Sequence, residues 1–145
     1  MAKQISILIA IIIMFSGISI IAGDFTDSGD GTVTDENTGL MWQQGEGGSM
    51  NWEDAISYCE GLFLAEYVDW RLPNIKELES ISDDSLYNPS IDTNFFPNAH
   101  SSAYWSSTTH AFLTSNAWGV LFYDGGVGYI SKSGSSYVRC VRGGQ

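Results

Sequence analysis

The sequence Tyr137-Val138-Arg139-Cys140-Val141-Arg142, close to the end of the chain, predicts a β-strand that carries one of the protein's two cysteines. Successive side chains of a strand point to opposite faces, so Val138 and Cys140 share one face and Arg139 lies on the other. We therefore expect the Cys140 thiol to point into the core of the protein.

The other cysteine, Cys59, lies in a predicted helix that begins after Asn51. Asparagine is a preferred N-cap residue, and the acidic Glu53 and Asp54 suit the first turn of a helix. Apolar residues recur at helical spacing, at Trp52, Ala55, Ile56, Cys59, Leu62 and Phe63. This pattern places Cys59 on the buried stripe, facing a strand packed beneath the helix.

Residues 1–23 indicate the compartment. Lys3 is followed by the apolar run Ile5–Ile21, which is the layout of an export signal. If the run is not cleaved, it is long enough for a short membrane span. We expect residues 1–23 to be a signal peptide or an N-terminal membrane anchor, and residues 24–145 to form one domain that is secreted, periplasmic or displayed at the cell surface.

Two cysteines in an exported chain predict a disulfide between Cys59 and Cys140, because that compartment is oxidising and the pair leaves no odd thiol. Such a bridge would stabilise the fold by about 4 kcal/mol on the chain-entropy model. Zinc is not expected, since two cysteines and the distant His100 and His110 do not make a zinc-ligand pattern.

The rest of the chain predicts an α+β domain. A second helix is expected after Pro73, where Asn74 and Glu77 have the spacing of a capping box. Stretches with strand character, bounded by turn residues, lie at 32–34, 40–42, 104–108, 117–123, 127–131 and 137–142. They predict a small antiparallel sheet beside the two helices.

The segment 82–103 has no periodicity and predicts a long loop region. Its apolar residues Ile91, Phe95 and Phe96 are expected to anchor the loop in the core. The Asp27, Asp30 and Asp35 group brackets glycine-rich turns, and a hairpin explains it better than an ion-binding loop.

Five motifs, in this order along the chain, resemble the Lcl C-terminal domain family of bacterial proteins, which is named from a collagen-like adhesin. They are Phe25-Thr26-Asp27-Ser28-Gly29-Asp30-Gly31-Thr32-Val33-Thr34-Asp35, Thr38-Gly39-Leu40-Met41-Trp42, Asp69-Trp70-Arg71-Leu72-Pro73-Asn74-Ile75-Lys76-Glu77-Leu78, Tyr104-Trp105-Ser106-Ser107-Thr108 and Tyr137-Val138-Arg139-Cys140-Val141-Arg142. The resemblance implies a C-type lectin-like fold, distantly similar to the formylglycine-generating, sulfatase-modifying enzymes. In those relatives the matching cysteines are bridged, which again implies the Cys59–Cys140 pair.

The resemblance implies recognition more than catalysis. The formylglycine-generating enzymes depend on further cysteines before the final strand, and this chain has none between Cys59 and Cys140. No nucleophile elbow accompanies His100, His110 and the serines near them. We expect no enzyme activity but an exported recognition or adhesion domain, at the cell envelope or outside the cell, that binds a protein or glycan. The alternatives are a degenerate relative of those enzymes and a purely structural envelope module.

Ligand contacts are expected at the long loop and the neighbouring strand ends, as the C-type lectin-like resemblance implies. The candidate residues are Asp92, Asn94, Tyr104, Trp105, Trp118 and Asp124. Trp105 and Trp118 offer flat stacking surfaces, although strand tryptophans are often core residues. Asp83, Asp84 and Asp92 are weak calcium candidates, with solvated turn residues as the alternative. The Glu-Pro-Asn, Gln-Pro-Asp and Trp-Asn-Asp motifs of sugar-binding C-type lectins are absent.

The negative charge of the protein limits the classes of partner that it is expected to bind. The net charge of −11 repels phosphate backbones, so no nucleic acid partner is expected, and a sulfated polysaccharide is disfavoured for the same reason. Membrane contact is expected only through the N-terminal segment, no cofactor beyond the weak calcium candidates is expected, and the oligomeric state is left open. Arg71, Arg139 and Arg142 are expected to pair with nearby carboxylates as structural residues.

Overall fold

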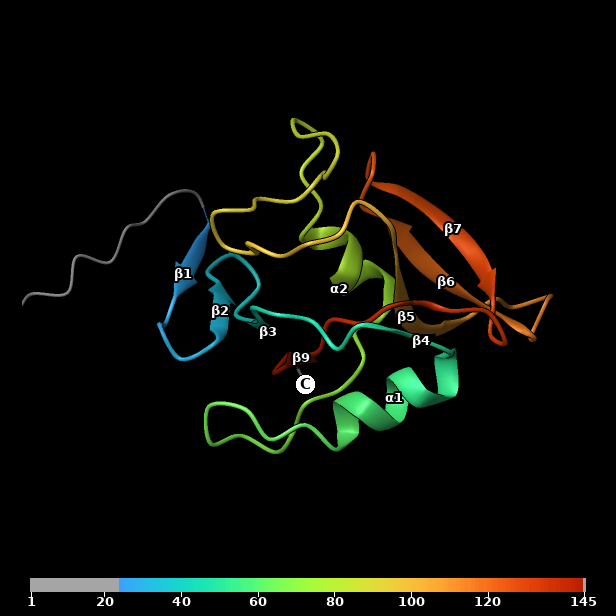
Figure 1. The fold of residues 1–145 in the computed structure, drawn as a ribbon, viewed down its shortest axis with the longest axis horizontal. Coiled ribbons are helices and arrows are strands. Elements are labelled where there is room, and N and C mark those ends of the chain that lie inside the picture. The colour runs from blue at the N-terminus through green and yellow to red at the C-terminus, as the bar shows by residue number, and fades with distance from the viewer. Residues whose placement is uncertain (1–23, 145) are drawn as a thin grey trace, which may run out of the picture.

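The computed structural model describes residues 24–144, so the predicted signal or anchor at 1–23 lies outside the described residues. Within them the chain forms two helices and two β-sheets (Figure 1). The helices are α1 (Trp52–Glu60) and α2 (Ile75–Ser80). The strands are β1 (Phe25–Asp27), β2 (Thr32–Asp35), β3 (Met41–Gln43), β4 (Ser49–Met50), β5 (Ala103–Thr109), β6 (Asn116–Leu121), β7 (Gly126–Ser131), β8 (Ser136–Tyr137) and β9 (Val141–Arg142). The predicted α+β class with two helices is confirmed.

The strands divide between two sheets, where the sequence predicted one. The first sheet has the order β1-β2-β3-β9 and is antiparallel throughout. The second has the order β4-β8-β5-β6-β7, and its β5–β8 pair is parallel. The predicted last strand is split between them, because β8 joins the second sheet and β9 joins the first.

The segment between β8 and β9 crosses from one sheet to the other inside the protein. Val138, Arg139 and Cys140 are all at most 1% exposed, so the expected alternation of a buried and an open face is wrong here. Alternation requires a strand with one solvated face, whereas this segment is covered on every side. Cys140 still points toward α1, as its position relative to Val138 predicted.

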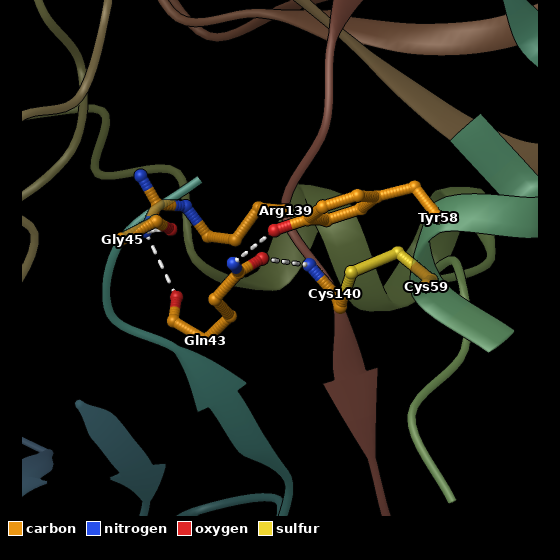
Figure 2. The surroundings of a disulfide bond; sticks show 6 residues. All are labelled: Gln43, Gly45, Tyr58, Cys59, Arg139 and Cys140. Carbon is orange, nitrogen blue, oxygen red and sulfur yellow. Dashed lines mark hydrogen bonds between the residues drawn. A yellow bond between two sulfur atoms is a disulfide. The ribbon is translucent and has the colours of Figure 1, made fainter. Parts of the chain in front are cut away.

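The Cys59–Cys140 disulfide is confirmed. It joins α1 to the residue just before β9, and the two cysteines are 81 positions apart in sequence with their Cα atoms 5.5 Å apart. Gln43 supports the bridge, as Figure 2 shows: its side chain accepts a hydrogen bond from the Cys140 amide at 3.2 Å and donates one to the Tyr58 hydroxyl at 2.8 Å. The end of β3, helix α1 and the crossing segment are thereby fixed to one another.

Both helices begin where the sequence predicted. The Asn51 side chain accepts a hydrogen bond from the Asp54 amide, and Asn74 and Glu77 form a complete capping box. The predicted buried stripe of α1 holds for Ala55 and Cys59 but is wrong for Phe63, which is 69% exposed. Phe63 lies beyond the end of the helix at Glu60, so the helical spacing no longer applies to it.

The two helices cover opposite faces of the second sheet. Tyr104 and Trp105 are neighbours in β5 and therefore point to opposite faces. Tyr104 belongs to a core cluster that includes Leu78 of α2, whereas Trp105 belongs to one that includes Cys59 of α1. The predicted anchors of the long loop, Ile91, Phe95 and Phe96, are buried in the first of these clusters, as expected.

Arg71 connects α2 to the C-terminal end of the described chain. Its two terminal nitrogens each donate to the Glu77 carboxylate at 2.7 Å, and one also donates to the Gly143 carbonyl at 2.8 Å. Partial burial raises the pKa of Glu77, but the hydrogen bonds from Arg71 and from the Asn74 amide outweigh it and leave the pKa below its ordinary value.

No helix within residues 24–144 is long and apolar enough to cross a membrane.

Replacing Cys59 with serine is expected to destabilise the domain by about 4 kcal/mol, because the unfolded chain regains the freedom of an 81-residue loop. Thermal unfolding followed by circular dichroism measures the loss. Cys140→Ser should cost a similar amount, since either change opens the same bridge. An unchanged melting temperature together with titratable thiols in the purified wild-type protein contradicts the disulfide.

Glu77→Gln is expected to cost about 1 kcal/mol at neutral pH, a value reduced for the partial exposure of the pair. Because the pKa of Glu77 is lowered in the folded protein, its contribution is present above the ordinary value of 4.5 and is lost as the pH falls through the folded pKa. Urea unfolding of both proteins across this pH range should show the difference shrinking in acid. Glu79→Gln, in the exposed pair with Lys76, is the control and should have little effect. A difference that is constant with pH contradicts the assignment.

Candidate functional site

An exposed group of aromatic rings lies at the outer end of the second sheet, on β6, β7 and the turn between β5 and β6. It consists of His110, Phe112, Trp118 and Tyr129, and is called the aromatic platform below. Phe112 is 91% and Tyr129 54% exposed. In Figure 1 these strands form the edge of the domain that lies furthest from the first sheet. Because aromatic residues are enriched where proteins contact partners, the platform is the candidate interaction surface of the described chain.

The rings of the platform support one another. His110 is stacked on Trp118, with ring centroids 4.9 Å apart and planes 28° apart. Tyr129 stands edge-on to both, at 4.9 Å from His110 and 5.8 Å from Trp118. Offset stacking and edge-to-face contacts are the favourable arrangements of aromatic pairs. His110, Trp118 and Tyr129 therefore form a preformed surface whose side chains are ordered by their neighbours, whereas Phe112 pairs only with His110, with ring centroids 6.4 Å apart.

Strand geometry explains why Trp118 is available. Trp118 and Val120 are two residues apart in β6 and point to the same face of the sheet. Val120 is fully buried in the cluster that contains Leu78 of α2, whereas Trp118 is only partly buried. Tyr129 is directly opposite Trp118 in β7. The sheet thus extends beyond the short helix that covers it, and the uncovered part carries the platform.

His110 is held in one orientation by the turn that it begins. Its backbone amide donates to the Asn116 carbonyl at 2.9 Å, which closes the β5–β6 hairpin. Its Nδ1 accepts hydrogen bonds from the amides of Phe112 at 3.2 Å and Leu113 at 3.0 Å. A neutral imidazole that accepts at Nδ1 carries its proton on Nε2. The platform therefore has a hydrogen-bond donor at the edge of its apolar surface.

A second concentration of polar groups surrounds the largely buried carboxylate of Glu46. One of its oxygens pairs with His100 and the other accepts a hydrogen bond from the Tyr104 hydroxyl. Burial, with a further contribution from Glu46, raises the pKa of Tyr104, which keeps this hydroxyl protonated and donating. The His100 ring is also stacked on Tyr137, with centroids 4.1 Å apart. These contacts fix the loop after β3 to β5 and β8.

The structure separates the aromatic residues that the sequence proposed for ligand binding. Trp118 lies in the aromatic platform. Tyr104 and Trp105 are both 0% exposed, so neither ring offers a stacking face, and their assignment to the ligand surface is corrected to the core. The Trp105 indole donates to the Met50 carbonyl at 2.8 Å, which satisfies its polar group inside the protein.

The carboxylates proposed as ligand or calcium contacts stabilise the turns in which they lie. Asp83, Asp92 and Asp124 each accept a hydrogen bond from the amide two residues later, at 2.8 to 2.9 Å. Asn94 supplies one of these amides and is exposed. Asp83, Asp84 and Asp92 line one hollow of about 520 Å³. Within residues 24–144, however, no three acidic, histidine or cysteine side chains are grouped to hold a metal ion.

The remaining aspartates and the arginines have structural partners. Asp27, Asp30 and Asp35 accept hydrogen bonds from nearby turn amides, as a hairpin requires. The arginines have the expected structural partners: Arg71 pairs with Glu77, Arg142 with Asp69, and Arg139 lies 3.8 Å from Glu46.

Sequence reasoning missed His110, Phe112 and Tyr129 as members of the platform. The only available signal was the alternation of Val127 and Tyr129 in a predicted strand, which shows that they share a face but not which face is open. That depends on the register between β6 and β7 and on the length of α2, and neither follows from the residues alone.

Residues 31–142 match the family model described as the Lcl C-terminal domain. A comparison with curated proteins finds no match.

Trp105→Ala and Trp118→Ala are expected to differ sharply in stability. Replacing the buried Trp105 should cost about 3–5 kcal/mol, because the change leaves a cavity and removes the hydrogen bond from the indole to the Met50 carbonyl. Replacing the partly exposed Trp118 should cost about 1 kcal/mol of stability, because mainly its aromatic contacts are lost. Urea unfolding measures both. Equal losses would show that Trp118 is a core residue and not part of an open platform.

Proposed function

Given that the chain belongs to the Lcl C-terminal domain family, we propose that it is an exported, non-enzymatic recognition or adhesion domain that binds a glycan on the aromatic platform. The observation that supports this most directly is the exposure of ordered rings that the fold does not need to cover. Trp118, His110 and Tyr129 are packed against one another, yet Tyr129 is 54% exposed and the other two rings are partly exposed.

The shape and chemistry of the platform suit a sugar ring. The apolar C–H face of a pyranose can pack flat on a ring such as Trp118, while its hydroxyls need hydrogen-bonding groups around the contact. The Nε2–H of His110 and the hydroxyl of Tyr129 provide such groups. Because the rings are already positioned, binding does not have to order them, which reduces its entropic cost.

The overall charge favours a neutral glycan. The chain carries 17 acidic residues against 6 lysines and arginines, and the platform itself has no carboxylate. A sulfated or phosphorylated glycan would approach against this field, whereas a neutral one is indifferent to it. With stacking as the main contact, binding does not depend on calcium.

The disulfide supports export and a binding role. Disulfides such as Cys59–Cys140 persist in oxidising compartments outside the cytoplasm. Both cysteines of the chain are used in this bridge, so no thiol remains for the oxidase chemistry of the formylglycine-generating enzymes. The role that fits these features is recognition at the cell envelope or outside the cell.

Trp118→Ala and Tyr129→Ala are each expected to weaken binding of a neutral glycan by about 2 kcal/mol, roughly thirtyfold in Kd, as is usual for a central aromatic contact. A glycan array identifies the ligand, and isothermal titration calorimetry with that ligand measures the variants. A metal chelator should leave the Kd unchanged.

Tyr87→Ala is the matched control, because Tyr87 is also an exposed aromatic residue but packs on Tyr123, outside the platform. It should bind like the wild type. The proposal is contradicted if the folded protein binds no neutral glycan, or if Tyr87→Ala abolishes binding and Trp118→Ala does not. Binding of a protein ligand alone would replace the proposed glycan with a protein partner.

A further inference from the structure

Strand β7 is an open edge of the second sheet. It pairs with β6 on one side and stands last in the strand order. Its register with β6 runs through six consecutive pairs without a bulge, from Asn116↔Ser131 to Leu121↔Gly126. The strand Gly126–Ser131 contains no charged residue and no proline, which are the usual features that keep an edge from pairing with another strand.

The pairing pattern shows which backbone groups of β7 are free of β6. The Lys132 amide donates to the Ser115 carbonyl, which makes this a hydrogen-bonded pair of the β6–β7 ladder. In an antiparallel ladder such pairs recur every second residue, so Ile130 and Gly128 also hydrogen-bond to β6. The amides and carbonyls of Val127 and Tyr129 therefore point away from the sheet. They provide two donors and two acceptors in line along an exposed edge.

We propose that this edge binds a second copy of the chain, with the two β7 strands antiparallel about a twofold axis at Gly128. In that register Val127 of each copy lies opposite Tyr129 of the other, so the free backbone groups of both edges satisfy one another. Gly128 meets Gly128 at the axis, where the strands of a pair that is not hydrogen-bonded approach most closely. A residue without a side chain allows this approach.

Side-chain complementarity supports the same register. A twofold axis at Gly128 places Val127 of each copy, which is 42% exposed, opposite Tyr129 of the other, which is 54% exposed. A β-branched residue that faces an aromatic residue favours a strand pair, and this pairing forms two such contacts.

The pairing also joins the two aromatic platforms. Tyr129 lies on the face that carries Trp118, and facing residues of antiparallel strands share a face. The two platforms therefore become one continuous surface across the shared sheet. A dimer would hold two sugar rings of one glycan chain, which strengthens binding without any new contact within a single copy.

Gly128→Lys tests the pairing, because a Cβ at Gly128 meets nothing within 4 Å in the single chain but places two like charges at the axis of the dimer. The protein is expressed from its full sequence and studied as the cell processes it, by sedimentation velocity across a wide concentration range. The wild type should reach twice the monomer mass, and Gly128→Lys should raise the dimer dissociation constant at least about tenfold. Gly45→Lys adds the same charge at another open glycine and should dimerise normally.

Cysteine substitution tests the register. In the proposed dimer the two Gly128 Cα atoms are about 4.5 Å apart, which a disulfide can span. Gly128→Cys should therefore give a covalent dimer on mild oxidation, whereas Val127→Cys should not, because the two copies of Val127 are diagonal across the axis. A wild type that stays monomeric at every concentration, or crosslinking through Val127 in place of Gly128, overturns the proposal. Trp118→Ala should still dimerise, so a failure of the proposed glycan site is measured separately.

Discussion

The fold depends on how the loop after β3 holds the buried guanidinium of Arg139, whose Nε and second terminal nitrogen have no hydrogen-bond partner among the described residues. One of its terminal nitrogens donates to three successive carbonyls, at 2.9 Å to Gln43, to Gln44, and at 2.6 Å to Gly45. The rings of Phe96 and Tyr104 lie over the group, and burial lowers its pKa from the ordinary value. An arginine stays charged even so. A buried charge without acceptors costs several kcal/mol, and the loop after β3 is therefore held where its carbonyls converge on Arg139.

This constraint organises both sheets. The residue after Arg139 carries the disulfide to α1, so a single buried segment fixes a helix, a loop and the crossing between the sheets. On one side of it β8 pairs with β5 and with β4, and on the other β9 pairs with β3. Once the crossing segment is fixed, β5 has a fixed position as well. Strands β6 and β7 are then added outward from it, away from the point where the chain is clamped.

Local chemistry made much of this predictable, and long-range geometry limited the rest. Asn51, Asn74 and Glu77 cap helices through contacts within three residues, so the spacing in the sequence predicts them. The disulfide followed from the number of cysteines and the face on which each lies. The role of Arg139 did not follow, because the carbonyls that accept its hydrogen bonds lie 94 to 96 residues away. Tyr104 and Trp105 were assigned in part to the ligand surface because a strand pattern cannot show that helices cover both faces.

The aromatic platform and the open edge of β7 both lie on the part of the second sheet that α2 does not cover. Helix α2 spans six residues, about 9 Å at the rise of an α-helix, and it covers Val120 but leaves Trp118 and the strand beyond it uncovered. A sheet that extends past its helix exposes side chains on its face, and because β7 is the last strand, its outer backbone groups are exposed as well. Exposed aromatic rings and an uncharged, glycine-containing edge add little to the stability of the isolated chain, about 1 kcal/mol for Trp118. They are well suited to contacts with another molecule, on the face through Trp118 and Tyr129 and along the edge through Val127 and Gly128.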